Sequence, residues 1–400
     1  MKRVLLYAHD AVGLGHIRRV CRIADGLARL HGDVTTLVLS GSSVADALPF
    51  PEGSDVVKLP SLRKYHNGAY GARHLHVDDK SIVRMRTAMI GAAFRTFEPD
   101  LVIVDKVAAG VHGELVPALR TLRRLNPNAQ IVLSLRDILD DPASVRRGWA
   151  KDGTLDTIRE LYDRVFVWGM PEICDVVTEY SMPADIAAKV EYCGYLASED
   201  RDGDTSPKKS PTRKRLVVTT VGGGEDGGRI LSTFVKSLAH TRESFASVVV
   251  MGPDLPEQTR SEIRRLVQHS TRPVFAVDFT RHLDRLFDAC DLVVSMGGYN
   301  TMTEVVSRGR RAIVVPRVHP RTEQLIRARR LEEAGHVRML HPNDLTPQSL
   351  ADALDTELRA EPRTPVQPLV FSGLERAVQV LLGGSRDVFA PTVEPRRAIA

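Results

Sequence analysis

Short apolar runs, rich in β-branched residues, alternate along the chain with longer segments in which apolar residues recur every three or four positions. The runs indicate strands buried on both faces, and the segments between them indicate amphipathic helices. Strands alternating with helices predict parallel sheets covered by helices on both faces. The predicted strands are 4–8, 34–39, 101–104, 131–135 and 165–168 in the first half, and 216–220, 248–251, 274–277, 292–295 and 313–315 in the second.

The alternation is interrupted once, between the two halves. Residues 199–215 (EDRDGDTSPKKSPTRKR) contain no large apolar side chain, two prolines and many charges, which is typical of a linker. We therefore predict an α/β protein with one Rossmann-like domain over 1–198 and a second over 216–383, followed by a loose tail over 384–400. Because ligands of open parallel sheets bind beyond the carboxyl ends of the strands, two such sheets predict a cleft between the domains.

Composition narrows the class of protein. Of the 400 residues, 43% are hydrophobic and 26% are charged, as in soluble globular proteins. No apolar run reaches the ~18 residues of a membrane-spanning helix, and the first residues lack the pattern of a signal peptide. The four cysteines are scattered, without a C-x-x-C pair, so we expect a cytoplasmic protein without a disulfide framework. The net charge of +5 is dispersed and aromatic residues are only 5%, which disfavours nucleic-acid binding and indicates weak attraction to an anionic ligand or lipid surface.

The first of three glycine-rich turns spans residues 9–19 (HDAVGLGHIRR) and joins the first predicted strand to a helix. Gly13 and Gly15 permit a tight turn and the close approach of a ligand. His16 falls at the helix start, where the positive end of the helix dipole disfavours an imidazolium. His16 is therefore either a neutral general base at the cleft or a histidine that only caps or packs the helix. Arg18 stands where a dinucleotide fingerprint requires glycine, so that fingerprint is absent.

The second turn, residues 221–229 (VGGGEDGGR), follows the first strand of the second half and carries five glycines around an acidic pair. Such a loop directs several backbone N–H groups at a phosphate, or alternatively forms a mobile cover over the cleft. It lacks the Lys-Ser/Thr ending of a P-loop, which disfavours nucleoside triphosphate hydrolysis.

The third turn, residues 295–305 (SMGGYNTMTEV), passes from a strand through two glycines into a helix that begins near Asn300 or Thr301. This pattern is typical of an anion site at a helix N-terminus, with Glu304 one turn further in, where it could accept hydrogen bonds from ribose hydroxyls. The alternative is a capping box between Thr301 and Glu304, which needs no ligand.

A fourth segment, residues 315–335, passes from a strand through a polar loop into another helix at the same end of the sheet. Glu323 and Gln324 begin that helix. An adjacent carboxylate and amide suit a polyhydroxylated ligand, because sugars present paired donors and acceptors. The alternative is a solvated first turn with a favourable acidic residue.

Together these segments resemble the GT-B glycosyltransferases, and among them family 28, which contains the lipid II-forming N-acetylglucosaminyltransferase of peptidoglycan synthesis. The segments that carry the resemblance are GLGHIRR, GGGEDGGR, GGYNTMTE and VPRVHPRTEQ, in this order along nearly the whole chain. A bacterial group of predicted glycosyltransferases is the most similar, since it shares an LRDILD segment (135–140) and a VDK segment (104–106).

The resemblance implies that the second domain holds a nucleotide-sugar and that the first holds the acceptor. It implies that His16 lies near the anomeric carbon as the base, with Asp105 as a reserve base or as a group that orients His16 or the acceptor. Glu304 would bind the ribose, and Glu323 and Gln324 would contact the donor sugar's hydroxyls. The implied diphosphate residues are Gly222, Gly223, Gly224, Gly297, Gly298, Asn300 and Thr301, and Gly13, Gly15 and Asp137 fall on the acceptor side, where Asp137 alternatively only pairs with Arg136.

The predicted activity is therefore an inverting transfer of a sugar from a UDP-sugar, with UDP-GlcNAc as one candidate, to a hydroxyl of a small-molecule or envelope acceptor. No cofactor or metal is expected, because no D-x-D pair stands in a suitable place and helix dipoles would stabilise the leaving diphosphate. The sequence does not distinguish UDP from TDP as the nucleotide of the donor. It also leaves open whether the protein is a monomer or a homodimer and whether it contacts a membrane surface. The acceptor pocket is expected in residues 60–80, where His66, His74 and His76 match no standard metal site.

Two alternatives remain open from the sequence. The spacing G-x-G-H-x-x-R, from Gly13 to Arg19, also resembles hydrolases of UDP-sugars that share the fold, in which the same histidine would activate water. A nucleotide-sugar-binding protein without catalysis is the second alternative.

Overall fold

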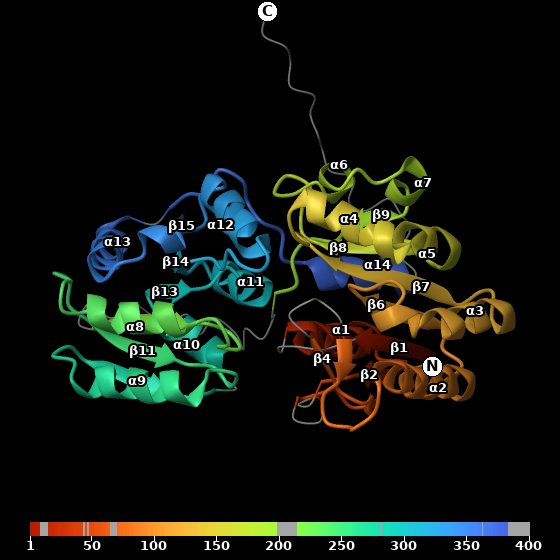
Figure 1. The fold of residues 1–400 in the computed structure, drawn as a ribbon. Coiled ribbons are helices and arrows are strands. Elements are labelled where there is room, and N and C mark those ends of the chain that lie inside the picture. Colours follow the sequence, from red (N-terminus) through yellow and green to blue (C-terminus); the bar gives the residue numbers. More distant parts are fainter. Residues whose placement is uncertain are drawn as a thin grey trace, which may run out of the picture.

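The structure is a computed structural model that describes residues 1–8, 15–42, 45, 48–64, 70–197, 214–280, 282–361 and 363–382. Gly13, His66, the predicted linker up to 213 and the predicted tail lie outside the described residues. The described elements form two lobes side by side, each built on a parallel sheet with helices packed against it (Figure 1). Among the described residues, no helix combines the length and the hydropathy that crossing a lipid bilayer requires.

The N-terminal lobe contains a seven-stranded parallel sheet in the order β3-β2-β1-β6-β7-β8-β9. All five strands predicted in this half are present, and their centres are buried on both faces. The two edge strands β3 and β9 were not predicted, because their residues are mostly half-buried and lack a continuous apolar run. The strands are β1 (Lys2–Ala8), β2 (Val34–Ser40), β3 (Ser54–Lys58), β6 (Leu101–Asp105), β7 (Gln130–Arg136), β8 (Arg164–Trp168) and β9 (Val190–Tyr192).

Helices pack on both faces of this sheet. Apolar residues recur every three or four positions along the first helix, and the structure buries all four of them, Ile17, Val20, Ala24 and Leu27. A small antiparallel hairpin of β4 (Leu62–Lys64) and β5 (Tyr70–Ala72) occupies the region predicted to form the acceptor pocket. The helices are α1 (Gly15–His31), α2 (Asp79–Phe97), α3 (Val116–Leu125), α4 (Pro142–Asp152), α5 (Thr154–Leu161), α6 (Val176–Glu179), α7 (Ala184–Ala187) and the 3-10 turn Val111–Gly113.

The C-terminal lobe repeats this plan with a six-stranded parallel sheet in the order β12-β11-β10-β13-β14-β15. The five predicted strands are again present, whereas the two-residue edge strand β15 was not predicted. The strands are β10 (Arg215–Thr220), β11 (Phe245–Val250), β12 (Val274–Val277), β13 (Leu292–Ser295), β14 (Arg311–Val314) and β15 (Arg338–Met339). The helices are α8 (Gly228–Ser237), α9 (Glu257–Gln268), α10 (Leu283–Ala289), α11 (Tyr299–Ser307), α12 (Glu323–Glu333), α13 (Pro347–Arg359) and the 3-10 turn Pro342–Asp344.

The last described helix, α14 (Gly373–Leu382), returns to the N-terminal lobe (Figure 1). Its apolar side chains share a core with α1, and the approach is so close that a Cβ at Gly26 would lie 2.0 Å from Leu374 Cδ2. The returning chain runs beside the outgoing one, since Leu196 and Ser372 form an antiparallel bridge. By packing, α14 therefore belongs with the first sheet, although its place in the sequence lies within the predicted second domain.

Candidate functional site

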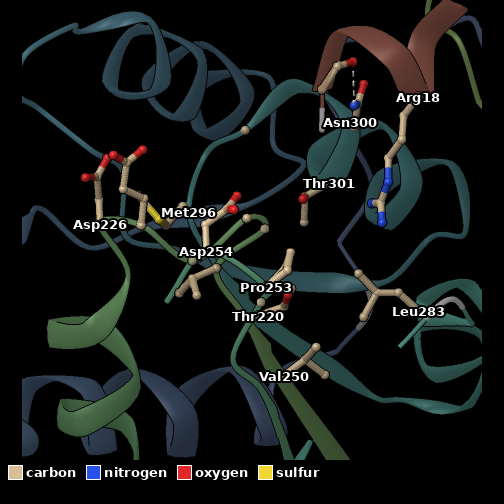
Figure 2. Close-up of a pocket in the computed structure, with 18 of the residues that line it drawn as sticks. Arg18, Thr220, Asp226, Val250, Pro253, Asp254, Leu283, Met296, Asn300 and Thr301 are labelled. Atoms are coloured by element: carbon tan, nitrogen blue, oxygen red, sulfur yellow. Dashed lines mark hydrogen bonds between the residues drawn. The ribbon is translucent and has the colours of Figure 1, made fainter. Parts of the chain in front are cut away.

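A cleft of about 260 Å³ lies where the carboxyl ends of strands from both sheets face one another. Figure 2 shows Thr220 and Val250, the last residues of β10 and β11, at one end of it. The position agrees with the general rule for open parallel sheets. The predicted site residues that the structure brings together around this cleft are Gly15, Gly222, Gly223, Gly224, Gly298, Asn300, Thr301 and Gln324.

Two helix N-termini meet at the cleft, one from each lobe. Helix α11 begins directly after Gly298, and α1 begins at Gly15. The Asn300 side-chain amide joins them, because its Nδ2 donates a hydrogen bond to the Gly15 carbonyl oxygen over 3.2 Å. Arg136 adjoins this turn, since a Cβ at Gly15 would lie in ordinary van der Waals contact with Arg136 Nη2, at 3.5 Å. Two positive helix ends in one cleft make it a favourable place for an anion.

The capping-box alternative for the third turn is wrong. The N-cap of α11 is Gly298, no side chain caps the helix, and Thr301 already lies inside it. The carboxylate of Glu304 instead forms an ion pair with Arg22, which belongs to α1 of the other lobe. Glu304 is 8% exposed and is not among the residues that line the cleft.

His16 and Asp105 are in direct contact beside the cleft. His16 Nδ1 is hydrogen-bonded to the Asp105 carboxylate, and Arg19 Nε donates to the other oxygen of that carboxylate over 2.7 Å. Both His16 and Asp105 are buried, with 7% and 1% of their surfaces exposed. Burial alone would raise the pKa of Asp105, but the charges of Arg19 and His16 outweigh it and hold that pKa well below its ordinary value. Asp105 is therefore ionised and suited to orient an imidazole rather than to accept a proton itself.

Arg136 lies between this His–Asp pair and the cleft. Its Nη2 atom is 3.4 Å from His16 Nε2, and its side chain is among those that line the cleft. Burial, reinforced by the charge of Arg19, lowers the pKa of Arg136 to about 10. Arg136 is therefore still a cation at neutral pH.

Glu323 and Gln324 are buried at the start of α12, so the alternative of a solvated first turn is wrong. Glu323 Oε1 accepts a hydrogen bond of 2.6 Å from Arg317 Nη2, and Gln324 Oε1 accepts one of 3.1 Å from the Arg317 backbone N–H. Glu323 Oε2 is buried and has no hydrogen-bond partner among the described residues. Burial favours a raised pKa for Glu323, but Arg317 and other nearby cations lower it, so the carboxylate is charged. A buried, charged oxygen without a donor is an acceptor suited to a ligand hydroxyl.

Asp137 and Gly297 face away from the cleft. Asp137 forms a fully buried ion pair with Arg327 of α12, in which Arg327 Nη2 and Nε lie 2.7 Å and 3.0 Å from the carboxylate oxygens. Arg327 Nη1 also donates to the Gly297 carbonyl oxygen over 2.9 Å. Asp137 therefore forms an ion pair, as one of the two alternatives predicted, but its partner is Arg327 of the other lobe and not Arg136.

The cleft is also lined by residues that the sequence did not single out for binding, and these include Arg18, Arg136, Arg317, Asp254 and Phe279. Arg18 lies in the first turn of α1. Its position directly after the glycine–histidine turn could have indicated in the sequence that it lines the cleft. Phe279 follows β12 at its carboxyl end and is 43% exposed, which is unusual for a phenylalanine and suits stacking on a planar ring.

No group of three or more His, Cys, Asp or Glu side chains among the described residues is arranged to hold a metal ion. His74 and His76 are exposed in the loop that precedes α2.

Residues 217–367 match the family model described as the glycosyltransferase family 28 C-terminal domain. A curated UDP-N-acetylglucosamine--N-acetylmuramyl-(pentapeptide) pyrophosphoryl-undecaprenol N-acetylglucosamine transferase from Proteus mirabilis (strain HI4320) is 31% identical over 147 residues, which are 36% of this chain and 41% of that protein. The chain matches about two fifths of the length of such curated relatives. The C-terminal lobe is therefore similar to the family 28 C-terminal domain, which agrees with the resemblance found in the sequence.

Solved structures extend the likeness of fold to the whole chain. MurG from Acinetobacter baumannii has a TM-score of 0.58 at 15% identity, covering 95% of this chain and 99% of that one. The UDP-GlcNAc 2-epimerase from Neisseria meningitidis, bound to UDP-GlcNAc, has a TM-score of 0.57 at 13% identity, covering 96% of this chain and 100% of that one. The predicted GT-B fold of two Rossmann-like domains is confirmed.

Proposed function

We propose that this chain, with a C-terminal lobe similar to the family 28 domain in a GT-B fold, is an inverting, metal-independent glycosyltransferase that uses a UDP-sugar. The observation that carries the proposal is the convergence of the N-termini of α1 and α11 on one cleft, with the buried pair His16–Asp105 beside it. The helix ends suit a diphosphate, and the histidine suits the deprotonation of a hydroxyl.

The donor is assigned to the C-terminal side of the cleft. Its diphosphate lies against Gly298, Asn300 and the glycine loop 222–224, and its base stacks on Phe279. The unpartnered Glu323 Oε2 accepts a hydrogen bond from a hydroxyl of the sugar, and Gln324 contacts a second one. UDP-N-acetylglucosamine is the first donor to test, because the name of the Proteus relative includes it and the Neisseria epimerase structure contains it.

The reaction is a single displacement at the anomeric carbon. The acceptor oxygen forms its bond to that carbon from one face while the bond to the diphosphate oxygen breaks on the other, through an oxocarbenium-like transition state. The electron pair of the broken bond leaves with UDP. His16 Nε2 takes the acceptor proton, while Asp105 holds the Nδ1–H and so fixes the tautomer.

The acceptor is proposed to be a polar small molecule or an envelope precursor, bound by the N-terminal lobe at the cytoplasmic side of the cell. The name of the Proteus relative describes a lipid-linked acceptor, which favours an envelope precursor.

The decisive experiment incubates the purified protein with a panel of UDP- and TDP-sugars, with and without candidate acceptors, and measures UDP or TDP, free sugar and product. Transfer predicts nucleotide release that depends on an acceptor. Release of free sugar in equal amount without any acceptor would instead identify a hydrolase, in which water takes the acceptor's place at His16. Tight binding without turnover would identify a binding protein.

Glu304 is proposed to accept a hydrogen bond from a ribose hydroxyl of UDP. Replacing Glu304 with alanine is therefore expected to weaken UDP binding roughly 10- to 100-fold, since a hydrogen bond to a carboxylate contributes on the order of 1.5–3 kcal/mol. Isothermal titration calorimetry measures the affinity. The matched control is Arg22→Met, which removes the same ion pair and leaves the carboxylate in place, so UDP affinity should be retained. If both variants behave alike, Glu304 acts only through its contact with the other lobe.

Treatment with EDTA is expected to leave the transfer rate nearly unchanged, because helix dipoles and side-chain cations take the role of a divalent ion at the diphosphate. Initial rates before and after chelation, and after addition of Mg²⁺ or Mn²⁺, measure this. A loss that Mg²⁺ or Mn²⁺ restores would contradict metal independence.

A further inference from the structure

We propose that two arginines of the N-terminal lobe, Arg18 and Arg136, contact the β-phosphate of the donor and stabilise it as it leaves. The inference rests on the proposed function and extends it, because it assigns part of the leaving-group site to the lobe that holds the acceptor.

Both side chains line the cleft from the same lobe. Arg18 projects from the first turn of α1, and Arg136 is the last residue of β7. Figure 2 shows the Arg18 side chain extending from α1 along the side of the cleft that carries Asn300 and Thr301, with Asp226 on the opposite side. The two arginines therefore flank the place where the N-termini of α1 and α11 meet.

Neither arginine forms an ion pair with a carboxylate in the described part of the chain, and this distinguishes both of them from the other arginines nearby. Arg19 pairs with Asp105, Arg22 with Glu304 and Arg327 with Asp137. No hydrogen bond or ion pair joins Arg18 to another described residue, and none of the described carboxylates forms an ion pair with Arg136, whose Nε is buried without a partner.

The burial of these cations is unfavourable in the absence of an anion. Burial is the largest influence on each of them and lowers the pKa of Arg18 as well as that of Arg136. Nearby carboxylates offset this only in part, since Glu304 acts on Arg18 and both Asp105 and Glu323 act on Arg136 without forming an ion pair with it. An incoming anion would therefore stabilise both buried cations further. A site that keeps two such cations beside two positive helix ends is therefore prepared for a ligand with more than one negative charge, as a nucleoside diphosphate is.

The place of Arg136 identifies which phosphate is concerned. Its Nη2 lies 3.4 Å from Nε2 of His16, the proposed base, which must stand close to the anomeric carbon. The β-phosphate is bonded directly to that carbon through oxygen, so it is the phosphate nearest to Arg136. As the bond between the anomeric carbon and this oxygen breaks, the oxygen takes the electron pair, and nearby guanidinium groups stabilise the growing charge.

The experiment compares the affinities of UDP and UMP for the intact protein and for the variants Arg18→Met and Arg136→Met by calorimetry. Each variant is expected to lower the ratio of UDP to UMP affinity about tenfold, because only UDP has the β-phosphate, while UMP affinity stays nearly constant. Arg18→Lys and Arg136→Lys should restore part of the ratio. The turnover of Arg18→Met should fall about 10²–10³-fold.

Arg29→Met is the matched control, because it removes the same charge from the last turn of α1, where Arg29 faces Glu375 of α14 and not the cleft. Its affinity ratio and turnover should equal those of the unaltered protein. Thermal unfolding of every variant shows that the fold is kept.

The outcomes separate the two proposals. If the unaltered protein binds UDP more tightly than UMP and both methionine variants keep that ratio, the assignment of the arginines is overturned and the proposed function stands. If neither nucleotide binds the unaltered protein, the proposed function fails and this inference fails with it.

Discussion

Replacing His16 with alanine is expected to lower the turnover of sugar transfer about 10²–10⁴-fold, the usual contribution of a general base. UDP affinity should be almost unchanged, because His16 is not among the residues that line the cleft and its proposed partner is the acceptor hydroxyl. Initial rates at saturating donor, together with calorimetric UDP affinities, measure both quantities. A turnover near that of the unaltered protein would remove His16 from the mechanism.

Two controls sharpen this result. His74→Ala removes a histidine that is exposed and lies outside the cleft, so its turnover should stay normal. Asp105→Asn keeps the size of the side chain but no longer favours the proton on Nδ1, so turnover should fall strongly even though His16 is present. Normal turnover in Asp105→Asn would leave Asp105 with a structural role only.

Replacing Arg327 with methionine is expected to destabilise the protein by about 3–5 kcal/mol, the usual cost of breaking a buried ion pair from one side. The change leaves the Asp137 carboxylate 1% exposed and without its ion-pair partner, and it removes the donor of the Gly297 carbonyl oxygen. Urea unfolding followed by circular dichroism measures the change in the free energy of unfolding.

The double variant Asp137→Asn/Arg327→Met should recover a large part of the lost stability, because neither charge of this pair then remains buried. Arg120→Met is the surface control. Arg120 pairs with Glu160, both side chains are at least half exposed, and such pairs contribute about 0–1 kcal/mol. A loss in Arg327→Met as small as that in Arg120→Met would mean that the interlobe pair contributes little.

The sequence predicted the parts of the fold that depend on local pattern. All ten predicted strands are present, because each is a short run rich in apolar and β-branched residues. Most of these runs are buried, and the edge strand β12, with Phe275 65% exposed, is the exception. Five strands were missed. β3, β9 and β15 lie at sheet edges, and β4 and β5 form the small hairpin. Each is only two to five residues long and lacks a continuous apolar run. The return of α14 to the first lobe could not be predicted, since its amphipathic pattern shows an apolar face but not which partner covers it.

The sequence predicted the candidate site to about the same extent as the fold. Glycine-rich turns after strands located the cleft, because such turns need only local backbone geometry. Contacts across the lobes were not predictable from local spacing: Glu304 meets Arg22 over a separation of 282 residues, and Asp137 meets Arg327 over 190. The proximity of His16 and Asp105, 89 residues apart, was only one of the alternatives considered.

The bridge between Leu196 and Ser372 has a mechanical consequence. The chain passes from the first lobe to the second and back again, and the two passages run beside each other at this bridge. The two lobes are therefore joined at this point by two chain passages that pair with each other, and not by one. It also means that no single cut yields two intact halves, because a fragment that stops before 214 lacks the helix that covers α1.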